Sequence, residues 1–171
     1  MAKPPQKPSP TPIERISEPS ADLDALPTRV GALREKILEA VEARDIEFLR
    51  PAIEWNETPP IFARGERPKG FSQTIEFLKS RSFDGKGNET LALLKAVFAQ
   101  PYVKTVRGPA TTYVWPSFAM RQAPDPAPEL RLAMLRCVRF ANLGLTNDIG
   151  LPLIERIGIG ADGTWHYFWA G

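Results

Sequence analysis

The sequence predicts an α+β fold in which about four helices pack on a small antiparallel sheet, completed by a C-terminal β-hairpin. The first observation is that residues 153–159 (LIERIGI) and 164–169 (TWHYFW) are rich in β-branched or aromatic residues and flank the turn sequence GADG. The second is that four earlier segments repeat apolar residues at helical spacing. A lone hairpin is marginal in water, so the two apolar faces of this one require further strands and covering helices.

Length and composition fit one globular domain. The chain has 171 residues, of which 43% are apolar and 25% charged, and both values are ordinary for a folded domain. Proline is the exception, since seven of the 18 prolines fall within residues 1–27. We therefore expect residues 1–28 to be a disordered or polyproline-II tail that tethers a domain spanning residues 29–171.

The first helix is predicted over residues 29–44, after Thr28 as its N-cap. Four apolar residues at helical spacing give it a core face: Val30, Leu33, Ile37 and Val41. A short continuation over residues 46–49, capped by Asp45, is expected to stop at Pro51.

A connection rich in proline and glycine, residues 51–71, leads to two further helices, predicted over 73–81 and 89–99. Strands are predicted over residues 102–106 and 111–116. The proline at the end of the second strand indicates that this strand stops there or lies at an edge.

The last helix is predicted over residues 129–142 and is apolar on two sides. One face carries Leu130, Met134, Cys137 and Ala141, and Leu132 and Leu135 point nearly opposite. Such a helix is either deeply buried or has a second contact surface. A protein partner is therefore expected, through this helix or through the proline-rich tail.

The single histidine, His166, would have to carry any Ser-His-Asp or Cys-His chemistry, with Cys137 or a serine such as Ser117. No G-x-S-x-G motif is present, and Cys137 lies on the predicted core face of its helix. The favoured interpretation is a strand histidine at the surface or in a hydrogen bond, with no catalytic residue in the chain. The alternative is a small hydrolase that uses His166 with a nearby carboxylate or hydroxyl.

No metal site and no cofactor are expected. One histidine and one cysteine do not supply the three or four ligands of a zinc site. The loop over residues 84–89 has a lysine between its oxygen donors, which favours a turn and helix cap over a calcium loop, and it lacks the Walker pattern. Carboxylates for a glycosidase pair are scattered, and their spacing does not show which of them share a cleft: Glu54, Glu57, Glu155 and Asp162.

Charge and hydropathy exclude some classes of partner. The formal net charge of +2 does not favour nucleic acid. The segment from residue 100 to 145 contains six basic and two acidic residues. We favour the interpretation that these charges form a solvated helix face over the interpretation that they bind an anionic partner. No apolar run reaches the ~20 residues of a membrane span. The start MAKPPQKPSP has no signal-peptide h-region, so the expected compartment is the cytoplasm, or the periplasm if an upstream leader was removed.

The strand aromatics are the most distinctive feature. With alternation of period two, Tyr113 and Trp115 share one face of their strand. Trp165, Tyr167 and Trp169 likewise share a face of the last strand, with His166 opposite. We favour a core position for these aromatics; the alternative is a partly exposed groove for proline-rich or sugar ligands. The tail itself contains Pro5-Gln6-Lys7-Pro8. The candidate ligand-binding residues are Tyr113, Trp115, Trp165, His166, Tyr167 and Trp169.

Three stretches, FDGKGNE at 83–89, YVWP at 113–116 and GIGADGTWHYF at 158–168, resemble a family of small uncharacterised bacterial proteins. The resemblance covers roughly residues 29–171. It implies a domain that is often exported behind a signal and a proline-rich stretch, although this sequence departs by lacking the signal. It implies no activity and no catalytic residues. The sequence as a whole thus predicts a non-enzymatic binding or structural module tethered by its tail.

Overall fold

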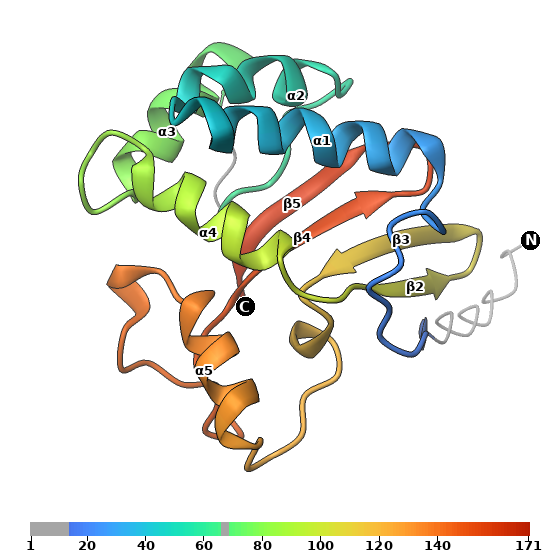
Figure 1. The fold of residues 1–171 in the computed structure, drawn as a ribbon. Helices are drawn as coiled ribbons and strands as arrows, with labels where there is room; N and C mark the ends of the chain where they lie inside the picture. The colour runs from blue at the N-terminus through green and yellow to red at the C-terminus, as the bar shows by residue number, and fades with distance from the viewer. Residues whose placement is uncertain (1–13, 66–68) are drawn as a thin grey trace, which may run out of the picture.

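The computed structural model describes residues 14–65 and 69–171 and confirms the predicted α+β class. Helices α1 to α4 gather on one side of a five-stranded sheet, while α5 lies apart from them near the bottom of the view (Figure 1). No helix within the described ranges has both the length and the hydrophobicity needed to cross a bilayer.

The sheet is an antiparallel meander in which strands neighbour one another in chain order, β1-β2-β3-β4-β5. The strands are β1 (Glu14–Ile16), β2 (Val103–Arg107), β3 (Ala110–Trp115), β4 (Glu155–Gly160) and β5 (Trp165–Ala170). The four strands predicted from sequence are confirmed, three of them to within one residue and β4 starting two residues later. The C-terminal hairpin thus completes the sheet as expected, with β4 paired to β3 on its other side.

The expected tail differs from the structure from residue 14 onward. β1 pairs with the edge of β2, and Ser17 continues this contact by donating its N–H to the carbonyl of Lys104 at 2.9 Å. The Tyr102 hydroxyl then donates to the carbonyl of Asp22 at 2.7 Å. The physical reason is that the open edge of β2 offers unpaired backbone groups, which even a short polar segment can satisfy. Residues 1–13, with the PxxP segment, lie outside the described residues.

The helices that cover the sheet are α1 (Thr28–Ala43), α2 (Arg50–Glu54), α3 (Thr74–Arg81) and α4 (Asn88–Phe98). The 3₁₀ helix η1 (Ile46–Leu49) precedes α2, and the Asp45 carboxylate caps it by accepting from the N–H of Glu47 at 2.9 Å. The prediction that this helical segment ends at Pro51 is wrong, because α2 follows η1 directly. Pro51 occupies the first turn of α2, where a proline has no hydrogen bond to lose.

The core lies between α1 to α4 and the sheet face that they cover. Two edge-to-face aromatic pairs span this layer: Phe98 with Trp115, with ring centroids 5.3 Å apart, and Phe62 with Trp165 at 5.2 Å. Strand β3 and the hairpin thus supply the centre of the core, in which Trp115, Trp165 and Phe168 are fully buried.

Helix α5 (Pro128–Arg136) is shorter than predicted, because the chain leaves the helix at Cys137 rather than after residue 142. The carbonyl of Cys137 accepts from the N–H of Glu155 at 2.7 Å, so it joins the start of β4 instead of a further helical turn. This turn also directs Arg139 inward, where it is 3% exposed. The apolar periodicity predicted a longer helix, but the contacts of Cys137 and Arg139 with Glu155 end the helix earlier.

Candidate functional site

The six candidate ligand residues do not form one surface. A β-bulge between Gly158 and Ile159 leaves His166 without a partner, so Ile159 pairs with Trp165 and Gly158 with Tyr167. Cross-strand partners lie on the same face of a sheet, and the extra residue reverses the alternation. Trp165 therefore faces the helices, and Tyr167 lies on the opposite face. The prediction that Trp165 shares a face with Tyr167 and Trp169 is wrong for this reason.

On the face toward the helices, Trp115 is 0% and Trp165 is 1% exposed, so neither side chain can reach a ligand. Tyr113 is partly buried beside Tyr102, with ring centroids 5.9 Å apart, and burial raises the pKa of its hydroxyl. The interpretation of these three residues as core, favoured from the sequence, fits their burial.

On the opposite face, Tyr167 and Trp169 pack edge-to-face with ring centroids 6.3 Å apart. The Arg156 guanidinium lies 5.8 Å from the first ring and 5.5 Å from the second. A second guanidinium, from Arg64, lies 5.7 Å from Trp169. The chain's own arginines thus occupy positions that a cationic ligand would take, which leaves little open aromatic surface there.

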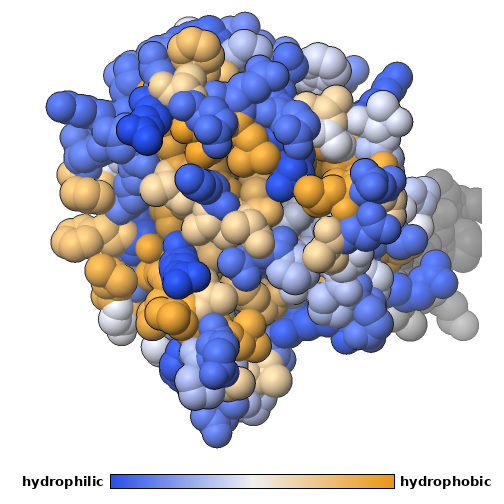
Figure 2. Space-filling model, viewed as in Figure 1, coloured by the Kyte–Doolittle hydropathy of each residue, from blue (hydrophilic) through white to orange (hydrophobic). Residues whose placement is uncertain are grey.

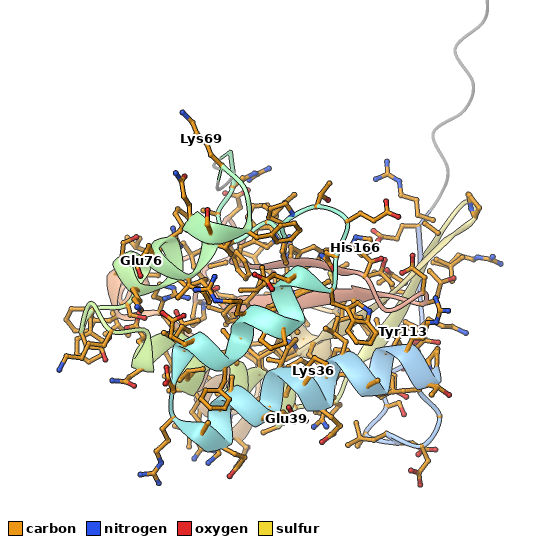
Figure 3. All side chains as sticks on the ribbon, turned by 90° about the horizontal axis from the view of Figure 1, so that it is seen from above. Lys36, Glu39, Lys69, Glu76, Tyr113 and His166 are labelled. Atoms are coloured by element: carbon orange, nitrogen blue, oxygen red, sulfur yellow. The ribbon has the colours of Figure 1, made fainter. Side chains whose placement is uncertain are left out.

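His166, labelled in Figure 3, is exposed at the bulge and lines a shallow hollow of about 290 Å³ with Thr111 and Asp162. Among the described residues no hydrogen bond holds its imidazole in place. The Asp162 carboxylate instead accepts from the N–H of Thr164 at 3.0 Å, which lowers the pKa of that carboxyl. A general base needs an orienting partner, so this geometry gives the hydrolase alternative no specific support.

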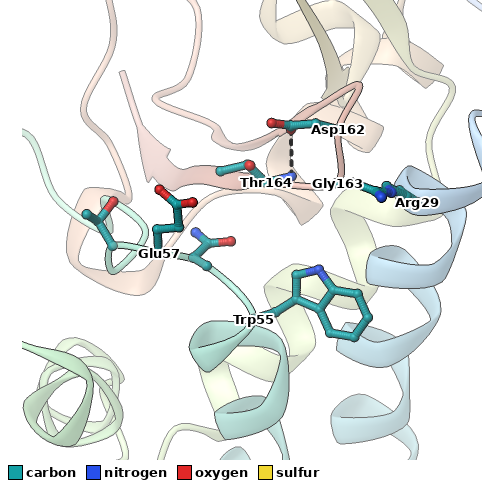
Figure 4. Close-up of a pocket in the computed structure, with 8 residues that line it drawn as sticks. Arg29, Trp55, Glu57, Asp162, Gly163 and Thr164 are labelled. Carbon is teal, nitrogen blue, oxygen red and sulfur yellow. Dashed lines mark hydrogen bonds between the residues drawn. The ribbon is translucent and has the colours of Figure 1, made fainter.

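A larger cleft lies on the other side of the same turn, with a volume of about 370 Å³. Three segments form its walls: the start of α1, the chain after α2, and the β4–β5 turn (Figure 4). Its lining includes Arg29, Trp55, Glu57, Thr58, Asp162 and Thr164. Of the scattered carboxylates, Glu57 and Asp162 therefore share a cleft, a proximity that sequence spacing did not reveal.

Glu155 lies elsewhere: it is the first residue of β4, fully buried beside the turn after α5. The Arg139 Nε donates to Glu155 Oε1 at 2.7 Å, and Arg139 Nη1 donates to Glu89 Oε1 at 3.2 Å. The second oxygen of Glu89 accepts from the backbone N–H of Phe140 at 3.1 Å. This ion-pair cluster fixes the segment after α5 to the core.

Cys137 is the buried neighbour of this cluster. Burial, together with the charge of Glu155, raises the pKa of its thiol to about 12. A thiol that stays protonated at neutral pH is not a nucleophile. No group of three or more potential metal ligands occurs among the residues that the structure describes.

The most distinctive surface is what we term the α5 face. Eight of the eleven exposed large apolar side chains among the described residues belong to it, each between 39% and 70% exposed. They are Phe83, Leu130, Leu132, Leu135, Phe140, Leu143, Leu145 and Ile149. Hydrophobic residues gather at the lower left of Figure 2, over α5, the segment after it and the α3–α4 loop. The Phe83 and Phe140 rings, 5.5 Å apart, join that loop to the segment.

The exposed Leu132 and Leu135 were predicted as a second apolar side, and they do lie on the surface. Phe140, Leu143, Leu145 and Ile149 were not predicted as exposed residues. The signal that could have found them is an apolar run after the helix that contains no acidic residue before Asp148.

No family model, no curated protein and no solved structure matches the chain.

Proposed function

We propose that the chain is a non-enzymatic protein-binding module whose docking surface is the α5 face, and that the occupant of this face is a second copy of the chain. The observation that carries the proposal is the concentration of exposed apolar side chains on residues 130–149 and Phe83. Large exposed apolar patches on soluble monomers mark interaction sites.

The way in which the face is held supports this proposal. Residues 137–149 are not kept in place by burying their own leucines, which point outward. They are kept in place by Arg139, whose ion pairs with Glu155 and Glu89 are buried. Buried ion pairs are a poor source of net stability, so their presence favours a role in positioning. Here they position an arm that presents apolar side chains to solvent.

The size of the face fits a stable interface. Together, eight side chains of this kind, each about half exposed, present roughly 600–800 Å² of apolar surface, distributed over α5, the segment after it and the α3–α4 loop. A standard interface buries ~800 Å² on each partner. The α5 face alone therefore supplies most of the area that one side of a dimer needs.

The charges on α5 favour a second copy over other occupants. Glu129 lies in the first turn of the helix and Arg136 in the last. A two-fold axis perpendicular to α5 places this helix antiparallel to its copy in an isologous, self-complementary interface. Glu129 of each protomer then lies opposite Arg136 of the other, at the two ends of a stripe that contains Leu132 and Leu135. In this arrangement each Glu129 carboxylate is paired with an Arg136 guanidinium of the other copy.

In this proposal the proline-rich N-terminal segment is a tether. The described chain begins at Glu14, in the edge strand β1, whereas helix α5 lies near the bottom of Figure 1. A tether at β1 would leave the α5 face free to pair.

Sedimentation equilibrium over a range of about 1–200 μM tests the proposal. We expect reversible dimerisation for the wild type and a monomer for Leu132→Asp/Leu135→Asp, since a charge in an apolar interface is costly. Phe48→Asp is the matched control, because Phe48 is also exposed (55%) but lies on η1. A wild type that stays monomeric at 200 μM would overturn the second copy as occupant, and a different protein would then have to cover the face.

A further inference from the structure

We infer that the cleft between α2 (Arg50–Glu54) and the β4–β5 turn binds a neutral, polyhydroxylated ligand such as a short saccharide. The inference is independent of the α5 face. The volume of about 370 Å³ falls within the ~300–1,000 Å³ of small-molecule sites. Aromatic and polar side chains converge on it from α1, residues 55–58 and the hairpin turn (Figure 4).

The indole of Trp55 lines the cleft and is exposed to solvent. This residue is 58% exposed, whereas Trp115 and Trp165 are fully buried. The Lys36 ammonium, on α1 (Figure 3), lies 5.6 Å from the ring centroid of Trp55. An indole offers a flat apolar face with a single N–H donor at its edge. A pyranose ring has the matching shape, because its C–H groups form an apolar face and its hydroxyls project from the rim.

Polar groups of both donor and acceptor type line the cleft together with this indole. Glu57 and Asp162 supply carboxylate acceptors, and Arg29 supplies guanidinium donors. The hydroxyls of Thr58 and Thr164 can donate and can accept a hydrogen bond. Asp162 accepts from the N–H of Thr164 through Oδ1, and its Oδ2 is a second acceptor atom. Such a mixture of donors and acceptors matches hydroxyl groups, each of which both donates and accepts.

Charge narrows the class of ligand. The lining itself holds two carboxylates, Glu57 and Asp162, and one guanidinium, Arg29; Lys36, which lies over the Trp55 ring beside the cleft, supplies the second positive charge that balances them. A site for phosphate or for a carboxylate ligand would carry an excess of cations, and a site for an amine would carry an excess of anions. The balanced set favours a ligand without net charge.

The walls of the cleft are fixed before any ligand arrives. Asn56 is buried, and its side-chain amide donates to the carbonyl of Trp165 at 2.6 Å and accepts from the N–H of Trp165 at 3.0 Å. The turn packs closely on α1, since a Cβ at Gly163 would lie 2.9 Å from the Cβ of Arg29. Preorganised walls reduce the entropy that ligand binding must overcome.

The inference concerns binding and not hydrolysis. A glycosidase needs one carboxylic acid that stays protonated near neutral pH. The N–H of Thr164 lowers the pKa of Asp162, so this carboxylate stays ionised and cannot serve as that acid.

Isothermal titration calorimetry and Trp fluorescence with cellotetraose, chitotetraose, maltotetraose and mannotetraose test the inference. We expect saturable binding of at least one of them below ~10 mM, and at least a tenfold loss of affinity in Trp55→Ala. Asp162→Asn should also weaken binding, although Asn keeps an Oδ1 acceptor for the turn. Phe48→Ala and Glu76→Gln, which alter an exposed aromatic and an exposed carboxylate outside the cleft, should bind as the wild type does.

Two results would overturn the inference. One is the absence of saturable binding of all four tetrasaccharides up to ~10 mM by the wild type. The other is binding that Trp55→Ala leaves unchanged, because the site would then lie elsewhere. Thermal unfolding of each variant shows that it is folded, and Trp55 is exposed enough for its removal to leave the core intact.

Discussion

Arg139 and Glu155 form a buried ion pair in which Nε lies 2.7 Å from Oε1, with the two side chains 3% and 0% exposed. The pair connects the turn after α5 to the first residue of β4. It is extended by Glu89, at the N-terminus of α4, whose carboxylate also accepts from the N–H of Phe140. Three segments that are distant in sequence therefore depend on one guanidinium.

Arg139→Met should destabilise the domain by about 3–5 kcal/mol, because it leaves Glu155 and Glu89 without their cationic partner in a buried position. Urea denaturation followed by circular dichroism measures this loss. Arg50→Met is the control: Arg50 pairs with Glu47 at 2.8 Å on the surface, where a pair is worth ~0–1 kcal/mol. Equal effects of the two substitutions would show that the buried cluster does not stabilise the fold.

Cys137 should become reactive only when the domain unfolds. Its thiol has a pKa of about 12 in the folded chain, above its ordinary value of 9.0, through burial and the charge of Glu155. A raised pKa in the folded state gives stability that is complete below pH ~9 and is lost as pH rises toward 12. The wild type should therefore lose more stability than Cys137→Ala between pH 9 and 11.

Labelling with a thiol reagent at pH 8 provides a second measurement on Cys137. The rate should follow the opening of the native state and rise with urea concentration. Fast, complete labelling in the absence of denaturant would contradict the burial of the thiol.

Gly158→Ala should destabilise the domain by ~1–3 kcal/mol, the usual range for overpacking. A Cβ at this position would lie 2.5 Å from the Tyr167 ring. Adding Tyr167→Ala removes the ring that causes the clash, so Gly158→Ala should cost much less in that background. Double-mutant-cycle analysis of thermal unfolding checks this coupling. Additive effects of the two substitutions would mean that the ring can move aside.

His166→Gln should change the free energy of unfolding by no more than ~0.5 kcal/mol, since the side chain is exposed at a bulge. Any hydrolytic activity of the purified protein should survive the substitution, because no described residue forms a hydrogen bond that orients the imidazole. Loss of such an activity in the folded variant would revive the hydrolase hypothesis.

The hairpin could be predicted from sequence because its information is local. Residues 153–159 and 164–169 alternate along the chain and surround a turn whose Gly163 has a φ of 88°, a region that favours glycine. The bulge at His166 could not be predicted, since it is a property of the register between Gly158 and Tyr167. One extra residue was enough to move Trp165 away from the face of Tyr167 and Trp169.

The other features that the sequence did not predict also depend on contacts between residues far apart in the chain. β1 has only three residues, and what holds it is the backbone edge of β2, almost ninety positions later. Arg139 looked like part of a solvated basic face, and only its distance to Glu155 shows otherwise. The cleft that joins Glu57 to Asp162 likewise required the fold to bring two loops together. Periodicity predicts elements and their faces, but it carries no information about such pairings.

Two tryptophans, Trp165 and Trp55, differ in burial and should differ in what their removal costs. Trp165→Ala should cost ~3–5 kcal/mol, the range for removing a large buried side chain, because Trp165 is 1% exposed and packs edge-to-face on Phe62. Its indole N–H also donates to the carbonyl of Tyr167 at 3.2 Å. Trp55→Ala should cost under ~1 kcal/mol, since Trp55 is 58% exposed. Thermal and urea unfolding measure both.

A chain truncated after Gly160 should not fold, because it loses Trp165 and Phe168 from the core and leaves β4 with an unpaired edge. Even half burial of two aromatic side chains of ~150–250 Å² is worth on the order of 4–6 kcal/mol at ~25 cal/mol per Å². That is a large part of the ~5–15 kcal/mol by which a typical domain is stable. A truncated protein that unfolds cooperatively and stays monomeric would show that α1 to α4 and β1 to β4 form a sufficient core, and Trp165→Ala should then be mild as well.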